Sequence, residues 1–205
     1  MARYLDIHPV NPQPRLIEQV VSILRDDGLI AYPTDSGYAL GIQLGNRAGL
    51  DRMRSIRQLD EKHHFTLVCH DFAQLGQLVH IDNAIFRMVK AATPGPYTFI
   101  LPATSEVPRR LMHPKKRNVG VRIPDHTLVH ALLDALGEPL ISTTLVLPGD
   151  TEPMSEGWLI KDELDQLLDA VIEGDAGSLP TTVVDFTSGV PEISRYGAGE
   201  TSRFE

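Results

Sequence analysis

The stretch Ala31-Tyr-Pro-Thr-Asp-Ser-Gly-Tyr-Ala-Leu-Gly41 follows the apolar run of residues 29–32 and is the most informative part of this chain. Pro33 fixes its own φ angle and is not expected to continue a central strand. Thr34, Asp35 and Ser36 supply three short polar side chains that can hydrogen-bond either a ligand or the local backbone. The stretch therefore predicts a substrate loop after a strand, with an ordinary turn as the alternative.

The size and composition of the chain indicate one soluble domain over residues 1–205. Its 205 residues, 42% hydrophobic and 22% charged, are typical of a globular protein with a substantial core. No apolar run is long enough to cross a membrane, and the N-terminus lacks the apolar core of a signal peptide, so a cytoplasmic location is expected. The single cysteine, Cys69, excludes an intrachain disulfide and a cysteine-based zinc site.

Charge is distributed unevenly along this acidic chain. The formal net charge of -8 argues against a protein that coats nucleic acid with a basic surface. Residues 107–122 nevertheless form a basic patch that contains no acidic residue. Its members are Arg109, Arg110, Lys115, Lys116, Arg117 and Arg122. Such a patch on an acidic protein is typical of a site that binds one anionic ligand. The alternative is an ordinary solvated face.

Hydrophobic periodicity and turn residues predict alternating helices and strands. Helices are expected at 14–27 and at 160–173, and a further helix should end near residue 58. Three more helices are expected to begin after N-caps at Asp71, Asp82 and Asp125. Strands are expected at 29–32, 65–69, 97–101, 119–123, 139–146, 181–186 and 193–196. Residues 148–157 form the most plausible mobile loop. The series predicts an α/β fold with a twisted open mixed sheet flanked by helices.

Familiar catalytic motifs are missing from the sequence. It contains no P-loop, no dinucleotide-binding glycine fingerprint and no nucleophile elbow. His126 and His130 have metal-ligand spacing, but nothing supplies a third ligand, so no metal is expected. His63 and His64 lie in a polar turn and are interpreted as solvated residues, one of which could touch an anion.

Two arginines and two hydroxyl clusters are candidate binding groups. Arg57 ends a helix and suits bidentate capture of phosphate or carboxylate, although a surface arginine is the plain alternative. Arg122 lies in an otherwise apolar strand, where an arginine needs a partner or a ligand. The hydroxyl clusters 142–144 and 181–182 lie at strand ends, where α/β proteins commonly place ligand sites, but they could equally be turn or cap residues.

Five ordered motifs resemble the YrdC-like family. They are Tyr32-Pro-Thr-Asp-Ser-Gly-Tyr-Ala-Leu-Gly, Thr93-Pro-Gly-Pro-Tyr-Thr, Gly120-Val-Arg-Ile-Pro, Ile141-Ser-Thr-Thr, and Pro180-Thr-Thr-Val-Val-Asp with Arg195-Tyr-Gly-Ala-Gly. The segments Ser-Ile-Arg-Gln-Leu and His-Phe-Thr-Leu place the chain closest to the YciO branch. The family includes threonylcarbamoyl-AMP synthases, which use L-threonine, bicarbonate and ATP in tRNA modification. The resemblance implies a twisted open sheet with a concave cationic groove.

The resemblance also implies roles for individual residues. Thr34, Arg122, Ser142 and Thr181 would bind the amino acid, with Arg122 on its carboxylate. Arg57, Thr144 and Arg195 would bind the nucleotide. ATP with magnesium would be a substrate, and no tightly bound cofactor is implied. RNA, as tRNA or double-stranded RNA, would be a further partner of the basic patch.

Two departures from the family pattern concern the chemistry. The synthases carry Lys-x-Arg where this chain has Ser55-Ile-Arg57, and Ser-x-Asn where it has Thr144-Leu-Val146. Arg54 is a doubtful substitute for the lysine because a one-residue offset turns a helical side chain by about 100 degrees. The family pattern also has a histidine in the strand that follows this arginine. The aligned position in this chain is Cys69, or His70 if the alignment is shifted by one residue.

Two hypotheses about function follow. In the first, the protein binds nucleotide, RNA or both, and has weak, altered or lost synthase activity, or acts on a related acyl- or carbamoyl-adenylate. In the second, it is a non-catalytic RNA-binding protein of the same fold. Catalytic residues are not assigned, and whether the protein is an enzyme is left open.

Overall fold

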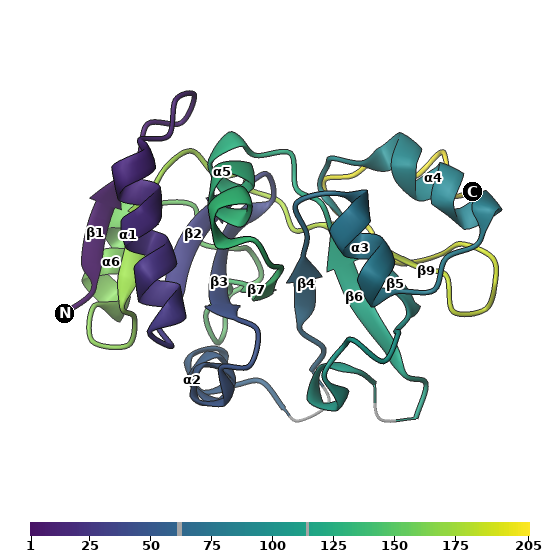
Figure 1. The fold of residues 1–205 in the computed structure, drawn as a ribbon, viewed down its shortest axis with the longest axis horizontal. Coiled ribbons are helices and arrows are strands. Elements are labelled where there is room, and N and C mark those ends of the chain that lie inside the picture. The colour runs from purple at the N-terminus through teal and green to yellow at the C-terminus, as the bar shows by residue number, and fades with distance from the viewer. Residues whose placement is uncertain (61–62, 114) are drawn as a thin grey trace.

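The fold is a ten-stranded mixed sheet with helices on both faces (Figure 1). The computed structural model describes residues 1–60, 63–113 and 115–205. The strand order is β1-β8-β2-β3-β7-β4-β6-β5-β9-β10. The strands are β1 (Arg3–Asp6), β2 (Ile30–Thr34), β3 (Gly37–Gln43), β4 (Thr66–Val68), β5 (Tyr97–Pro102), β6 (Asn118–Arg122), β7 (Leu140–Thr144), β8 (Ala170–Glu173), β9 (Thr182–Asp185) and β10 (Glu192–Arg195).

The helices divide between the two faces of this sheet. They are α1 (Pro14–Arg25), α2 (Arg47–Arg57), α3 (Phe72–Leu78), α4 (Asn83–Ala92), α5 (Thr127–Leu136) and α6 (Gly157–Leu164), with a 3-10 turn at Arg109–Leu111. Buried side chains of α1 and α5 belong to one hydrophobic cluster, and those of α2, α3, α4 and α6 belong to the other. The predicted α/β class with a mixed open sheet is therefore confirmed.

One face of the sheet is only partly covered by helices. Leu67 and Ile141 belong to the cluster that contains α3 and α4, while their neighbours Thr66 and Ser142 point to the opposite face because side chains alternate along a strand. That opposite face is covered by α1 and α5 only over the half of the sheet nearer β1 (Figure 1). Over β4, β6, β5 and β9 it is lined by small polar side chains, and a cavity lies there.

The stretch 31–41 is a β-hairpin rather than the predicted substrate loop. β2 continues through Pro33 to Thr34, and β3 begins at Gly37. Pro33 is tolerated because β8 pairs with β2 only at Ile30 and Ala31, so the proline lies beyond that ladder. Gly37 has a φ of 112°, a backbone conformation that favours glycine.

The predicted helix at 160–173 is wrong in its second half. α6 ends at Leu164, and residues 170–173 form the buried strand β8, which pairs in parallel with β1 and β2. The β-branched residues Val171 and Ile172 favour that strand, and both are fully buried. The edge strand β1 was not predicted.

The other predicted elements are confirmed, with one error in a helix cap. Asp71 and Asp82 cap α3 and α4 by accepting hydrogen bonds from backbone amides. Asp125 does not cap α5, because the helix begins one residue later, with His126 as its N-cap and no side-chain cap hydrogen bond. The Asp125 amide donates to Asp35. Within the described residues, no helix is long and apolar enough to span a membrane.

Candidate functional site

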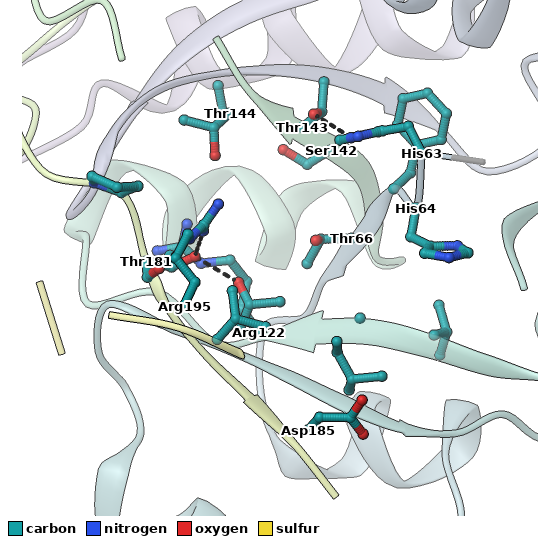
Figure 2. Close-up of a pocket in the computed structure, with 18 of the residues that line it drawn as sticks. His63, His64, Thr66, Arg122, Ser142, Thr143, Thr144, Thr181, Asp185 and Arg195 are labelled. Atoms are coloured by element: carbon teal, nitrogen blue, oxygen red, sulfur yellow. Dashed lines mark hydrogen bonds between the residues drawn. The ribbon is translucent and has the colours of Figure 1, made fainter. Parts of the chain in front are cut away.

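The cavity has a volume of about 490 Å³ and lies over the open face of the sheet (Figure 2). One row of cross-strand neighbours forms its floor, running from Ser142 through Thr66, Gly120 and Ile100 to Asp185. These residues come from β7, β4, β6, β5 and β9 in turn. The topology therefore gathers residues that are far apart in the sequence.

A glycine in the middle of the floor keeps the cavity open. A β-carbon added at Gly120 would lie 3.3 Å from Thr66 Oγ1 and 3.3 Å from Thr98 Cγ2, which is tighter than ordinary contact. A larger residue would also fill the space above these threonines. The absence of a side chain at this position thus creates room for a ligand at the centre of the site.

The cavity brings together all the predicted substrate- and nucleotide-binding residues except Thr34. Its lining includes Arg57, Arg122, Ser142, Thr144, Thr181 and Arg195. Thr34 is buried and is not among the lining residues. Its hydroxyl donates to the Gly37 carbonyl at 2.7 Å and accepts from the Ser36 amide at 3.1 Å, so it stabilises the hairpin turn.

Arg122 is held by the hairpin turn between β2 and β3. Its Nη2 pairs with the Asp35 carboxylate, and its Nη1 donates to Ser36 Oγ at 2.9 Å. The Asp125 amide fixes the other oxygen of Asp35 at 2.8 Å. The Arg122 Nε atom is buried without a hydrogen-bond partner in the described structure. The turn thus supplies the partner that a buried arginine requires, and one donor remains unused.

Arg195 and Thr181 form the wall opposite β7. Arg195 donates from Nε to the Thr181 carbonyl at 2.9 Å and from Nη2 to Thr181 Oγ1 at 2.7 Å. The same hydroxyl lies 2.9 Å from Thr98 Oγ1. Burial and, secondarily, the charge of Arg122 lower the pKa of Arg195. Two guanidinium groups are therefore held close enough to repel each other.

Arg57 contacts the end of β7. It donates from Nε to the Val146 carbonyl at 3.2 Å and from Nη1 to Thr143 Oγ1. Burial and then the charge of Arg195 lower its pKa below the usual value. Because a guanidinium stays charged at neutral pH, this repulsion favours an anion between Arg57 and Arg195.

Ser142 can only accept a further hydrogen bond. Its Oγ donates to the Leu40 carbonyl at 2.9 Å and lies 2.7 Å from the Tyr32 hydroxyl. Because the Ser142 hydroxyl proton points to Leu40, the Tyr32 hydroxyl is the donor of the hydrogen bond to Ser142; burial raises the pKa of Tyr32 to about 12. Ser142 therefore presents a lone pair rather than a proton to the cavity.

His63 and His64 both line the cavity; His63 is half-buried there, whereas His64 is exposed, as the sequence suggested. His63 Nε2 lies 3.2 Å from Thr143 Oγ1. Burial and then Arg57 lower the pKa of His63 to about 4, while burial and then His113 lower that of His64. Both imidazoles are therefore neutral at pH 7.

The low pKa of His63 predicts a loss of stability in mild acid. Its ordinary value is about 6.5, so between pH 6.5 and pH 4 the unfolded chain binds a proton that the folded protein does not. The free energy of unfolding should therefore fall as the pH is lowered through this range. His63→Gln should flatten that part of the profile, measured by urea denaturation from pH 4 to 8. Exposed His80, changed to glutamine, is the matched control; an equal flattening there would contradict the assignment.

The residues of the basic patch lie in three places: the main cavity, a neighbouring hollow and the exposed surface. Lys116 lines the main cavity. Arg109 and Arg117 line a neighbouring hollow of about 380 Å³ that shares His113 with it. Arg110 and Lys115 are exposed and line neither space.

Some cavity residues were missed by sequence reasoning. Thr66, Thr98, Asn118 and Asp185 line the cavity, yet none lies in a polar cluster of the kind that was used to find candidates. Thr66, Thr98 and Asp185 lie in segments that carry the family resemblance, but the only signal from the residues themselves is a polar side chain that alternates with apolar ones along a strand. Alternation marks a polar face, but it does not tell whether that face meets solvent or a cavity.

No metal-binding group was found among the described residues, where His, Cys, Asp and Glu form no cluster of three or more. His126 and His130 instead contact two backbone carbonyls, those of Asp175 and Pro124. Cys69 is buried in the opposite hydrophobic cluster, and burial raises its pKa to about 12.

Comparisons with known proteins match members of one family over most of the chain. Residues 22–197 match the Sua5, YciO and YrdC family, whose description is telomere recombination. The chain is 47% identical to YciO of Escherichia coli K12 over the full length of both, and the two structures superpose with a TM-score of 0.96. It is 31% identical to the threonylcarbamoyl-AMP synthase of Vibrio vulnificus YJ016, over 78% of this chain and 87% of that protein.

A more distant structure shares the fold. Sua5 of P. abyssi, solved in complex with L-threonine, has a TM-score of 0.85 at 21% identity. The match covers 96% of this chain and 57% of that one. At this identity the likeness concerns the fold alone.

Proposed function

This chain belongs to the Sua5, YciO and YrdC family, and from that premise we propose that its cavity binds an adenine nucleotide together with an amino acid. We further propose that threonylcarbamoyl-AMP synthase activity is weak, altered or lost. ATP with magnesium would enter as a substrate in the cytoplasm. Arg57, Thr144 and Arg195 would face the nucleotide, while Arg122, Ser142 and Thr181 would face the amino acid. Thr34 would act on the amino-acid side through the turn that holds Arg122.

The observation that carries this proposal is the convergence of Arg57, Arg122 and Arg195 on one cavity. Joining a carbamate to an α-phosphate brings several anions together, and fixed cations and donors are needed to hold them. Each of the three guanidinium groups is anchored by a named hydrogen bond from the fold. Preorganised charge of this kind supports the binding of phosphate and carboxylate groups in one space.

The two departures from the synthase pattern support weak chemistry. Ser55 is exposed on α2 and does not line the cavity. Arg54 does not replace the missing ammonium, because its guanidinium lies over the Phe65 ring at 5.2 Å and is not part of the lining. Val146 does line the cavity, where it presents an apolar side chain. Cys69 and His70 lie outside the lining as well.

A turnover assay tests this function. Purified protein is incubated with ATP, bicarbonate and L-threonine, and pyrophosphate release is followed beside a synthase that has an intact Lys-x-Arg motif. We expect ATP to bind while pyrophosphate forms at a rate orders of magnitude lower. Turnover equal to that of the intact synthase would contradict the proposal, and so would failure to bind ATP.

A non-catalytic RNA-binding function is the second candidate, favoured by the position of the basic patch. Lys116 lies in the main cavity, and Arg109 and Arg117 line the adjoining hollow, so phosphates could follow the patch into the cavity mouth. Binding of tRNA or double-stranded RNA through these cations should weaken steeply with salt. Affinity for RNA that does not change between low and high salt would count against this function.

A further inference from the structure

Asn118 is a buried polar residue of the cavity lining to which no role has been given so far. Its side chain lies on the cavity face of β6, because it is two residues before Gly120 in the same strand. The residue is only 6% exposed, and within the described residues its side-chain amide has no hydrogen-bond partner. A buried amide without a partner costs free energy in the empty protein, so it indicates a ligand group that forms hydrogen bonds with it.

The position of Asn118 fits the nucleotide rather than the amino acid. Arg122 is four residues further along β6, which at about 3.3 Å per residue separates the two backbones by about 13 Å. Arg57 contacts β7, and β7 lies two strand spacings, or about 10 Å, from β6. A nucleotide whose phosphates lie at Arg57 can therefore place its base at Asn118, whereas a threonine at Arg122 is too short to reach it.

Two imidazole rings lie at the same end of the cavity as Asn118. The His113 amide donates to the Asn118 carbonyl at 2.9 Å, and the centroid of the His113 ring lies 5.0 Å from that of the His64 ring. Both rings line the cavity, and Figure 2 shows His64 away from Arg122 and Arg195. Nucleobases stack on aromatic side chains of this kind.

The floor beside Asn118 has room for a flat ring. Gly120 has no side chain to project into the cavity, and its neighbour in β5, Ile100, is only partly buried by the protein. A planar base above Gly120 would cover the remaining apolar surface of Ile100, which is favourable because that surface leaves water.

We propose that Asn118 is the residue that recognises the adenine base of the nucleotide. This inference rests on the proposed function, in which the phosphates lie at Arg57 and Arg195. The amide oxygen of Asn118 would accept from the 6-amino group of adenine, and the amide nitrogen would donate to the adjacent ring nitrogen, which is the bidentate pairing that suits asparagine and adenine. Asn118 lies outside the five motifs that carry the family resemblance, so this contact is not among those that the resemblance implies.

Binding measurements with two nucleotides test this inference. ATP and purine riboside triphosphate, which lacks the 6-amino group, are each titrated with magnesium into the protein by calorimetry. Loss of the 6-amino group leaves the amide oxygen of Asn118 without a donor, so ATP should bind about tenfold more tightly. Inorganic tripolyphosphate is titrated as well, because it reports the binding of the phosphates alone.

Two asparagine variants assign the preference to one amide. Asn118→Leu should bring the two nucleotides to equal affinity and leave the affinity for tripolyphosphate unchanged. Asn83→Leu, at the exposed start of α4, is the matched control and should leave the preference intact. Since the Asn118 amide has no partner in the protein, the urea midpoint of Asn118→Leu should not fall. Asn118→Ser makes the same comparison if leucine prevents folding.

The possible outcomes separate this inference from the proposed function. ATP that binds no more tightly than purine riboside triphosphate would overturn the inference and leave the proposed function intact. A preference for ATP that survives the loss of the Asn118 amide, or an equal loss of affinity for tripolyphosphate, would also overturn it. If ATP does not bind to the unaltered protein, the proposed nucleotide site itself is wrong.

Discussion

Replacing Arg122 with methionine is expected to lower the free energy of unfolding by about 3–5 kcal/mol, because it leaves a buried carboxylate without its cation. The Asp35 side chain is only 12% exposed, and its charge is balanced by Arg122, which is 7% exposed. Methionine fills much of the arginine stem but supplies no donor. Urea denaturation at pH 7 measures this loss.

A double variant separates stability from binding. Asp35→Asn together with Arg122→Met removes both charges, so most of the lost stability should return. The binding of an amino-acid carboxylate should remain lost in both variants, since the guanidinium is absent from both. Two results would contradict this assignment: a single variant as stable as the wild type, or a double variant that binds the amino acid normally.

The pairing of Asp35 with Arg122 also explains the limits of the sequence prediction. The sequence predicted that Arg122 needs a partner or a ligand, and the family resemblance placed a ligand carboxylate there, but neither identified Asp35. The partner lies 87 residues away in the hairpin turn, and only the strand order brings the two together. Local sequence patterns indicate which side chains alternate along a strand and where turns occur. They contain little information about which distant strand pairs with a given strand.

The errors in secondary structure have a similar origin. Residues 170–173 follow an acidic amphipathic segment, and the helical pattern was extended into them. Pairing of β8 between β1 and β2 decides their conformation, and this pairing is a tertiary interaction. Pro33 is a second case in which strand pairing overrides the local preference. Proline disfavours a central strand, but it is accepted in β2 because the pairing of β2 with β8 ends at Ala31.

The variant with Ser55→Lys and Val146→Asn is expected to raise threonylcarbamoyl-AMP synthase turnover about a hundredfold or more. Each restored polar contact to a charged transition state contributes about 1.5–3 kcal/mol, and 1.4 kcal/mol corresponds to a factor of ten. Pyrophosphate release with ATP, bicarbonate and L-threonine measures the gain. Val146→Asn should give the larger single effect because residue 146 already lines the cavity, whereas a lysine at 55 must reach in from the exposed side of α2.

Matched variants show whether the polar groups themselves cause this gain. Ser55→Met supplies a long unbranched side chain without the ammonium, and Val146→Leu supplies bulk without the amide, so neither should raise turnover. Arg57 would gain a second cation nearby, and burial with the charge of Arg195 already lowers its pKa. The restored lysine should therefore strengthen the binding of ATP, whose phosphates offset the repulsion among these cations. A doubly restored protein that folds and binds ATP but gains no turnover would show that Ser55 and Val146 are not the cause of weak synthesis.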